Sequence, residues 1–485
     1  MKVKQLLRKY NDIPVQAKLA IWLTFCNLVQ RGMSLLTVPI FTRLMDKSQY
    51  GEYSSYLSWL SIATIICTFR LTGGVYNKGL SKYKEDQDGF CLAMQFTTSI
   101  ITIGCYFLYV VFSHWINRMT EMSFAVTSLL FLEVFFSTSL GFWSVRKQYL
   151  FKYKEVVIGT LTYAILNPIL GIVFVINAGQ EVRGLARIIS TVLAQVIVGL
   201  VFYIINIVKG KFKFNKSYSQ FAIKFNLPLL PHYFSEYILN QSDRIMIQKI
   251  CTYSEVALYS VAYNAGMVMT ILTSSINQAI TPWIYQSLDD KKIDEIGNVL
   301  VSLAIVLLIP ILVFIAMAPE VILILAGQQY AEAVYVIPPV AGSIVFLFLY
   351  NSFANIEFYY DYNKFTMYIS MIGAVINIIL NGIFIKLFGF VAAGYTTFFC
   401  YFIYCAGHYL FADKIVQKKQ GVHIIDPRKL CIVFIILLFV MVMMSLLYSH
   451  TLIRYISILI IVIITVYKRE KILTLFSELK NNKKK

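Results

Sequence analysis

The sequence predicts an all-α protein that crosses a membrane many times, and two observations lead to this fold class. In composition, 58% of the 485 residues are hydrophobic and only 14% are charged, with a mean hydropathy of +0.68. In soluble domains, by contrast, about a quarter of all residues are charged. In pattern, apolar stretches of about 20 residues, long enough to span a bilayer as a helix, recur between short polar loops.

About 14 such stretches occur along the chain, which leaves no segment for a separate soluble domain. The basic N-terminal segment precedes a stretch that is too long and too polar for a cleaved signal peptide, so we expect a retained first helix. The seventh stretch is amphipathic. The predicted spans are residues 17–41, 53–76, 90–112, 122–144, 156–177, 185–207, 226–249, 257–283, 296–317, 334–359, 365–387, 390–411, 430–448 and 451–467.

The distribution of Lys and Arg predicts the orientation of these helices, because cytoplasmic loops are richer in both. With the N-terminus inside, about 32 of the 43 Lys and Arg residues fall in cytoplasmic segments and about 7 in the opposite loops. We therefore expect an even number of helices with both termini in the cytoplasm. The asymmetry explains the net charge of +18 without nucleic acid, and anionic membrane lipids are expected contacts of the basic loops.

A short internal repeat predicts the domain organisation. The dipeptide Tyr-Ser occurs near the start of the second and of the eighth predicted helix, at Tyr53-Ser54 and Tyr259-Ser260, 206 residues apart. Carriers built from such repeats place their substrate sites between the halves. We expect an N-terminal lobe of six helices (residues 1–215), a C-terminal lobe of six (residues 216–412), and two additional helices with a basic cytoplasmic tail (residues 413–485).

Enzymatic and metal-dependent functions find little support in the motifs. The eight cysteines form no CxxC pair and the five histidines are scattered, so no metal site is expected. A phosphate-binding GxxxxGK[ST] loop does not occur, because Phe212 follows Gly210 and Lys211. A membrane-embedded glycan polymerase or ligase is disfavoured, since the longest outward connection, near "APEVILILAGQQYAEA", has only about 15 residues. A carrier without a cofactor remains.

Three motifs, in their order and spacing, carry a family resemblance: "VPIFTRLMDKSQYGEYSSYLSWL" after the first helix, "NQSDRIMI" in the seventh and "VALYSVAYNAG" in the eighth. Over about residues 15–412 the chain resembles the Wzx-type polysaccharide repeat-unit flippases of the multidrug/oligosaccharidyl-lipid/polysaccharide (MOP) exporter superfamily. The resemblance implies two lobes around a central cavity that opens alternately to the two sides of the bacterial cytoplasmic (inner) membrane.

The resemblance also implies a substrate and partners. The substrate would be an undecaprenyl-diphosphate-linked oligosaccharide, flipped to the outer leaflet for O-antigen, capsule or exopolysaccharide assembly. A polysaccharide polymerase and other assembly proteins would be candidate partners. A multidrug or cation antiporter of the same superfamily is the alternative, although such a carrier is expected to rely on intramembrane carboxylates rather than arginines.

Arginines inside the predicted helices are the first site candidates, because a charge in the membrane is costly and marks function. Arg31 shares one helix face with Thr24, Asn27 and Ser34. A polar face at mid-membrane must contact protein or water, which indicates either a cavity, with Asn27 and Arg31 as substrate residues, or an interhelical hydrogen-bond cluster. Arg70, near the inner end of the second helix, either lines the cavity or extends to the interface. For Arg187 we favour the interface.

The seventh helix carries the next candidates. Glu236, Asn240 and Asp243 recur at spacings of four and three residues and form one polar face, which Arg244 borders. Asp243 and Arg244 form either a plain interfacial ion pair or a site in which Arg244 binds phosphate. Asn240 is expected to contact the glycan, while Asp243 or Glu236 tunes the arginine or binds a coupling Na⁺ or H⁺.

Further polar residues favour a hydrated interior, although membrane helices also use them to hold neighbouring helices together. Glu133 stands near the middle of the fourth helix and needs an arginine, a proton or a cation, so it is a third ion-coupling candidate. The other stripes are Asn264, Ser274 and Gln278 on the eighth helix and Ser370, Asn377 and Asn381 on the eleventh, of which Asn264 and Asn377 are the substrate candidates.

Overall fold

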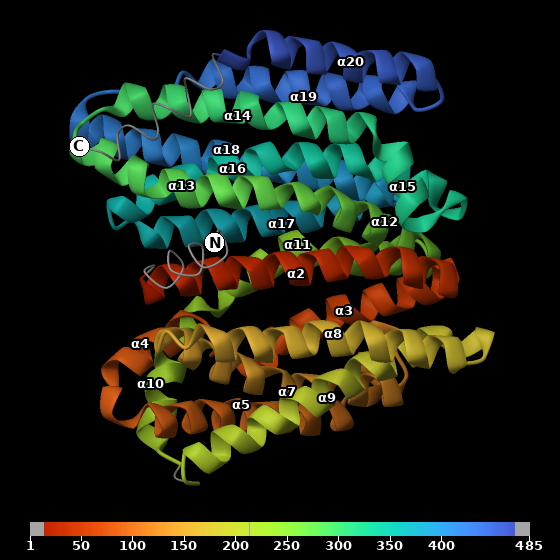
Figure 1. Cartoon of the computed structure of the whole chain (residues 1–485), viewed down its shortest axis with the longest axis vertical. Helices are drawn as coiled ribbons and strands as arrows, with labels where there is room; N and C mark the ends of the chain where they lie inside the picture. Colours follow the sequence, from red (N-terminus) through yellow and green to blue (C-terminus); the bar gives the residue numbers. More distant parts are fainter. Residues whose placement is uncertain (1–13, 213, 471–485) are drawn as a thin grey trace, which may run out of the picture. The chain divides into compact units, whose positions relative to one another are not determined.

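The computed structural model describes residues 14–212 and 214–470, and within them the regular structure is helical, without strands (Figure 1). The all-α membrane fold is thus confirmed. Ten of the described helices are long and apolar enough to cross a bilayer. The other predicted spans are also helical, apart from a turn at residues 69–73, but they are more polar or shorter, so the count of about 14 stays a prediction. The basic termini lie outside the described residues.

The chain forms two compact units, and the boundary between them lies within helix α11, after Tyr237. Within each unit, long helices lie side by side (Figure 1). The N-terminal unit contains α2 (Val15–Leu44), α3 (Lys47–Thr68), α4 (Gly74–Lys82), α5 (Gln87–Val111), α6 (Ser113–Thr120), α7 (Phe124–Tyr149), α8 (Tyr153–Asn177), α9 (Arg183–Lys209), α10 (Lys216–Asn226) and the start of α11 (Leu230–Ile250).

Helix α3 differs from its prediction at its C-terminal end. It begins at a capping box: the Asp46 side chain accepts from the Gln49 backbone N–H, and the Gln49 side chain accepts from the Asp46 backbone N–H. It ends at Thr68, because Phe69 and Arg70 adopt left-handed backbone conformations, with φ of 48° and 51°. Arg70 therefore lies in the turn between α3 and α4, and its placement inside the second span was wrong.

The core of the N-terminal unit combines aromatic packing with close helix approach. The rings of Tyr76, Phe90 and Phe142 pack together from α4, α5 and α7. Helices α7 and α9 approach closely at Gly199, where a Cβ atom would lie 2.5 Å from the Phe136 carbonyl oxygen. A small residue at this contact lets two membrane helices pack through their backbones.

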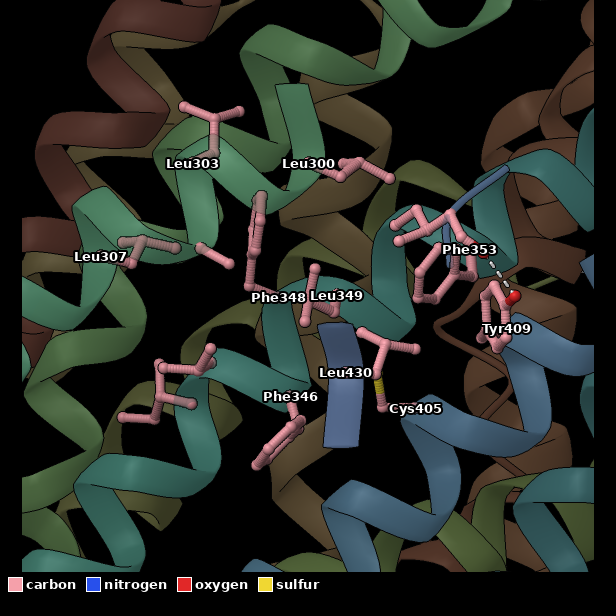
Figure 2. Packing of buried hydrophobic residues seen from close by; sticks show 14 of the residues in the cluster. Leu300, Leu303, Leu307, Phe346, Phe348, Leu349, Phe353, Cys405, Tyr409 and Leu430 are labelled. Atoms are coloured by element: carbon pink, nitrogen blue, oxygen red, sulfur yellow. Dashed lines mark hydrogen bonds between the residues drawn. The ribbon is translucent and has the colours of Figure 1, made fainter. Parts of the chain in front are cut away.

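The C-terminal unit is built around α16 (Ile337–Tyr359), which packs along α18 (Val391–Gln420). Leu300, Leu303 and Leu307 form a stripe on α14, and Phe348 of α16 lies toward it (Figure 2). Phe346, on another face of α16, packs against the rings of Phe398 and Phe402 of α18. The remaining elements are α12 (Tyr253–Gly266), α13 (Thr270–Asp289), α14 (Ile293–Ala316), α15 (Ala318–Ala326), the 3₁₀ segment Gln328–Val336, α17 (Asn363–Phe388), α19 (Pro427–Leu447) and α20 (Thr451–Tyr467). The predicted eighth span corresponds to α12 and α13, which one 3₁₀ turn joins.

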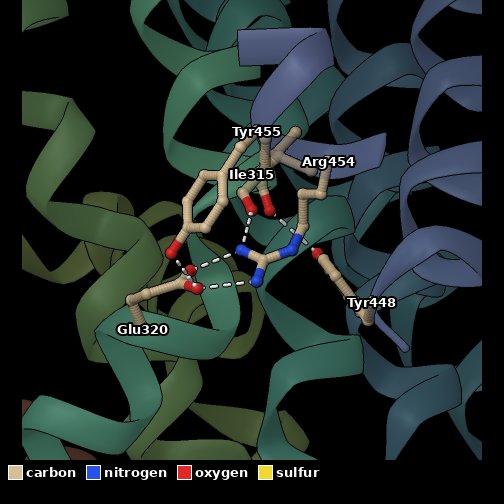
Figure 3. Close-up of polar contacts among 6 residues, drawn as sticks. Ile315, Glu320, Tyr448, Arg454 and Tyr455 are labelled. Atoms are coloured by element: carbon tan, nitrogen blue, oxygen red, sulfur yellow. Dashed lines mark hydrogen bonds and ion pairs between the residues drawn. The ribbon is translucent and has the colours of Figure 1, made fainter. Parts of the chain in front are cut away.

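A polar clamp attaches α20 to the C-terminal unit. The Arg454 guanidinium donates to both carboxylate oxygens of Glu320 on α15, Nη2 reaching Oε1 at 2.6 Å, and it also donates to the Ala316 carbonyl (Figure 3). Tyr455 donates to the same carboxylate. The hydrogen bonds from Arg454 hold the pKa of Glu320 below its usual value. A two-point arginine–carboxylate contact fixes orientation as well as distance.

Candidate functional site

A polar network inside the C-terminal unit surrounds Asp243 of α11. The Asp243 side chain has no exposed surface, although a buried carboxylate requires compensation. It accepts hydrogen bonds from the Tyr259 hydroxyl, from Asn381 Nδ2 at 2.6 Å and from Thr397 Oγ1 at 3.0 Å. These donors come from α12, α17 and α18, so four helices of the unit meet at one carboxylate.

Arg244, the next residue, is 5% exposed and is held by neutral groups. Its Nε donates to Ser260 Oγ at 3.1 Å, Nη1 to Gln241 Oε1 at 3.1 Å, and Nη2 to Asn264 Oδ1 at 3.4 Å. The guanidinium carbon lies 4.6 Å from the centre of the Tyr263 ring. Within the described residues, no carboxylate lies at ion-pair distance from Arg244. Asp243 and Arg244 are therefore not an interfacial ion pair.

Amide side chains extend this network. Asn377 accepts at Oδ1 from Ser242 and from Asn381, both at 3.2 Å, while its buried Nδ2 has no hydrogen-bond partner in the described structure. Asn240 accepts from the Tyr401 hydroxyl at 3.4 Å. The network thus brings together the predicted residues Asn240, Asp243, Arg244, Asn264 and Asn377.

An apolar hollow of about 580 Å³ lies beside the network between α17 and α18. Thr396 belongs to both, because it lines the hollow and donates to Asn381 Oδ1. Phe384, Phe388 and Phe399 form much of the remaining wall. Thr396 therefore connects the polar network with a surface suited to hydrocarbon.

The N-terminal unit buries a second acid and a second arginine. Glu133 of α7 is 3% exposed and accepts from the Tyr56 hydroxyl at 2.6 Å. Arg187 of α9 is 5% exposed and donates to Asn167 at 2.8 Å and to Thr191 at 3.0 Å, with its guanidinium against the rings of Phe41 and Tyr53. The prediction that Arg187 extends to the interface was wrong, because side chains from α2, α3 and α8 cover it.

The polar face of α2 is exposed, in contrast to the buried side chains of Glu133 and Arg187. Thr24, Asn27, Arg31 and Ser34 are all exposed, so their common face is not covered by the unit that contains them. The Thr24 hydroxyl donates to the Ala20 carbonyl of its own helix at 2.9 Å. On α13, Ser274 and Gln278 are also exposed. The exposed polar face of α2 is consistent with either of the two roles considered for it, and both stay open.

Arg70 and Glu236 form a partly exposed ion pair in the N-terminal unit. Arg70 Nη1 lies 2.6 Å from Glu236 Oε2, and the two side chains are 42% and 50% exposed. The guanidinium also lies 4.8 Å from the centre of the Tyr233 ring. Glu236 therefore does not join the Asp243 network, although both belong to α11. Its role as an ion-coupling residue remains a prediction.

Several site residues escaped the sequence reasoning. Tyr259, Ser260 and Thr397 contact the charged pair, yet tyrosine, serine and threonine are common in membrane helices and give no signal of their own. Arg454, Glu357 and His408 also lie within predicted spans, and the rule that an ionisable residue in a membrane helix is a candidate applies to all three.

Comparison with known proteins places the chain in a family. The family model described as "Polysaccharide biosynthesis protein" matches residues 17–288, which is more than half of the chain. The chain belongs to this family. A second model, MatE, matches residues 228–383. The predicted resemblance to the MOP superfamily is thereby confirmed.

Curated relatives agree with the family. The polysaccharide biosynthesis protein described here is 24% identical over 368 residues to the "Lsg locus putative protein 1" of Haemophilus influenzae, covering 72% of this chain and 86% of that protein. It is 25% identical over 424 residues to the "Probable low-salt glycan biosynthesis flippase Agl15" of Haloferax volcanii, covering 83% and 84%. The Haloferax relative is named a flippase, which agrees with the prediction of a carrier rather than an enzyme.

Solved structures share the fold. The lipid II flippase MurJ in an inward closed conformation aligns with a TM-score of 0.68 at 13% identity, covering 93% of this chain and 100% of that one. An inward-facing MATE family multidrug transporter of the MOP superfamily aligns with a TM-score of 0.59 at 13% identity, covering 80% and 99%. At these identities the likeness concerns fold alone.

Proposed function

We propose that the protein flips undecaprenyl-diphosphate-linked oligosaccharide repeat units from the cytoplasmic to the outer leaflet of the bacterial cytoplasmic membrane. The movement would occur by alternating access between lobes at residues 1–215 and 216–412. The observation that carries the proposal is Arg244, a buried guanidinium that neutral side chains hold in place. Family membership supports a polysaccharide precursor as the cargo.

The surroundings of Arg244 suit a diphosphate group. Its neighbours Ser260, Gln241 and Asn264 orient the guanidinium without neutralising it, so its charge remains available to an anion. Asp243, the adjacent acid, is instead engaged by donors from three other helices. The amides of Asn240, Asn264 and Asn377 offer donors and acceptors to sugar hydroxyls, with Asn27, Arg31 and Arg70 as further candidates in the N-terminal unit.

The membrane potential favours this direction of movement. Two negative charges carried out of a cell with a negative interior release about 4.6 kcal/mol per 100 mV. A coupling cation would add directionality. Asp243 is the strongest candidate, since its carboxylate is fully buried and contacts the hydroxyl groups of Tyr259 and Thr397. The carboxylate and these hydroxyl oxygens suit Na⁺, and protonation of the carboxylate suits H⁺. Glu133 and Glu236 are the other candidates.

A complementation experiment tests the proposal. Arg244→Ala, Arg244→Lys and the exposed control Arg428→Ala would be expressed in a flippase-null strain, with membrane abundance measured beside surface polysaccharide. We expect Arg244→Ala to insert yet lose at least about 90% of surface polysaccharide, and Arg244→Lys to restore part of it because the charge remains without the planar fork. A fully active Arg244→Ala protein at normal abundance would exclude Arg244 from substrate binding.

Orientation is a separate part of the proposal, supported by the distribution of Lys and Arg. Both termini and the loops at 145–155 and 208–220 would face the cytoplasm. Single cysteines in these loops, in a cysteine-free background, should resist a membrane-impermeant thiol reagent in intact cells. Ready labelling of either loop would reverse the orientation. Interaction with a polysaccharide polymerase and other assembly proteins belongs to the same proposal.

A multidrug or cation antiporter is the second candidate, favoured by the MatE match over residues 228–383. A cationic drug, however, would meet the uncompensated charge of Arg244, whereas an anionic head group would be attracted by it. Drug susceptibility of an expressing strain distinguishes the two functions. Increased resistance to cationic drugs without restored polysaccharide would favour the antiporter.

A further inference from the structure

Basic side chains gather in the N-terminal unit where α5 and α8 begin and α7 and α9 end, and the transport proposal does not use them. Arg146 and Lys147, in the last turn of α7, are 9% and 4% exposed. Each forms an ion pair, Arg146 with Asp88 of α5 and Lys147 with Glu155 of α8. Two cations are thus fixed inside the unit at the depth where its apolar spans end.

Lys209, the last residue of α9, brings a third positive charge to the same place. Gly210 lets this end of α9 approach α5, because a Cβ atom there would lie 2.6 Å from Leu92 Cβ. The positive charges of Lys147 and Arg146 repel that of Lys209. Within the described residues, no carboxylate lies at ion-pair distance from Lys209. Its exposed ammonium group is therefore held near two like charges and is accessible to an external anion.

Lys152, in the loop between α7 and α8, is the fourth cation. Its backbone N–H donates to the Lys147 carbonyl at 2.9 Å, which fixes the loop, and its ammonium lies 3.9 Å from Glu155. Glu155 interacts electrostatically with Lys147, Lys152 and Lys209, so these charges lie close together. Arg146, Lys147, Lys152 and Lys209, which we call the four-cation cluster, face only two acids. The excess of two positive charges makes this surface attractive to an anion.

The neighbouring residues favour a lipid phosphate over a free anion. Large apolar side chains next to the exposed cations in sequence are themselves exposed, Phe151 by 43%, Val208 by 62% and Phe212 by 72%. Aromatic side chains at the ends of membrane spans lie at the level of the lipid head groups. Basic pockets between membrane helices bind anionic head groups. A ligand that carries one phosphate above apolar chains matches both the charge and the apolar surroundings.

We propose that the four-cation cluster binds the phosphate group of an anionic phospholipid. The exposed ammonium groups of Lys152 and Lys209 contact the phosphate oxygens, while Arg146 and Lys147 stay paired with their acids and raise the local positive potential. The head group offsets the repulsion among the cations and thereby stabilises the ends of α7, α8 and α9 together. The site takes a lipid of the surrounding membrane rather than the cargo, so it does not depend on the proposed transport function.

Native mass spectrometry of the purified full-length protein in a neutral detergent tests the site. Dioleoyl phosphatidylglycerol is the probe. Dioleoyl phosphatidylcholine supplies the same chains with a zwitterionic head group, and inorganic phosphate supplies the anion without chains. We expect phosphatidylglycerol to bind at least fivefold more tightly than phosphatidylcholine, and its Kd to rise about tenfold or more in K152Q/K209Q, since each lysine near a lipid phosphate contributes a factor of about five.

The same two loops supply a matched control. The K154Q/K216Q variant removes two exposed lysines that form no ion pair in the described structure, and it changes the net charge equally. Its Kd for phosphatidylglycerol should stay within about twofold of wild type, because charges outside the cluster are screened by salt. Both variants keep the buried ion pairs of Arg146 and Lys147, and thermal unfolding checks that they are folded. K209Q alone serves if K152Q/K209Q is not.

Three outcomes would overturn the proposal. Equal weakening of phosphatidylglycerol binding in both variants would mean that the attraction is diffuse and no site exists. Displacement of the lipid by inorganic phosphate would assign the cluster to a free anion. Binding of undecaprenyl phosphate that is tighter than that of phosphatidylglycerol, and that is lost in K152Q/K209Q, would assign the cluster to the cargo.

Discussion

Each of the two compact units buries an arginine that neutral side chains hold, Arg187 in one and Arg244 in the other, and the surroundings of these two arginines are closely similar. In the N-terminal unit Arg187 donates to an asparagine, a serine and a threonine and stacks on Phe41 and Tyr53. In the C-terminal unit Arg244 donates to an asparagine, a serine and a glutamine and lies over Tyr259 and Tyr263. Neutral acceptors and aromatic rings thus surround a cation in both.

The difference lies in the acids. Asp243 adjoins Arg244 on one helix, and Tyr259 serves both, donating to the acid and facing the arginine. Glu133 and Arg187 are on separate helices, and the hydrogen bond of Glu133 comes from Tyr56, whereas Tyr53 faces the arginine. Because Tyr259 contacts both residues, a change in the charge of Asp243 alters the surroundings of Arg244 through this one side chain. We infer that the C-terminal unit is the better candidate for coupling an ion to an anionic substrate.

The largest expected effect on the free energy of unfolding comes from removing Arg187, the buried arginine of the N-terminal unit. Arg187→Ala should lower stability by about 2–5 kcal/mol, because it opens a cavity beside Phe41 and leaves Asn167 and Thr191 without their donor. Thermal unfolding in detergent measures this loss. Arg183→Ala, one turn earlier, removes a bond to the Leu44 carbonyl and should cost only about 1 kcal/mol. An unchanged melting temperature for Arg187→Ala would mean that the arginine stabilises nothing.

The second prediction concerns ion coupling and separates the acids. Asp243→Asn retains hydrogen-bonding capacity toward Tyr259 and Thr397 but removes the charge, so transport should lose its dependence on the Na⁺ or H⁺ gradient while the protein stays folded. Glu133→Gln should have a smaller effect and Glu236→Gln little, since Glu236 pairs with Arg70 at a partly exposed site. Gradient dependence that survives in all three variants would remove these acids from the mechanism.

The third prediction uses the repeated tyrosines. Tyr259→Phe removes a donor from a fully buried carboxylate and should cost about 1–3 kcal/mol. Tyr53→Phe removes only a weak acceptor for Thr191, at 3.5 Å, and should stay within about 0.5 kcal/mol. Equal losses in thermal unfolding would show that the two tyrosines have the same role and that the asymmetry between the acids has no energetic consequence.

Tyr53 and Tyr259 also show which features of the structure can be predicted from the sequence. The step Tyr-Ser at positions 53 and 259 predicts an internal repeat, and in each unit its tyrosine faces the buried arginine. Hydropathy predicts the helices because every apolar span must satisfy its own backbone hydrogen bonds. Helical spacing places Asn240, Asp243 and Arg244 on neighbouring faces of one helix, which brings them into one network.

What the sequence leaves undetermined depends on contacts between distant segments. Arg187 lies close to the start of its helix, so its depth favours the interface. Only the packing of α2 and α8 over α9 reveals that it is buried. The end of α3 depends on two left-handed residues that carry no glycine signal, which moves Arg70 out of the membrane helix. Glu357 and His408 are far apart in sequence, and only the contact between α16 and α18 pairs them.

The smallest expected effect on stability concerns Arg70. Because its ion pair with Glu236 is about half exposed, Arg70→Ala should change the free energy of unfolding by about 0–1 kcal/mol, far less than Arg187→Ala. A substrate role would nevertheless appear as reduced surface polysaccharide at normal abundance, since charge near the cargo matters where stability does not. Glu236→Ala serves as the control, because it breaks the same pair but leaves the cation. If both variants support normal polysaccharide, Arg70 is not a substrate residue, and the proposed site is confined to Arg31 and the Arg244 network.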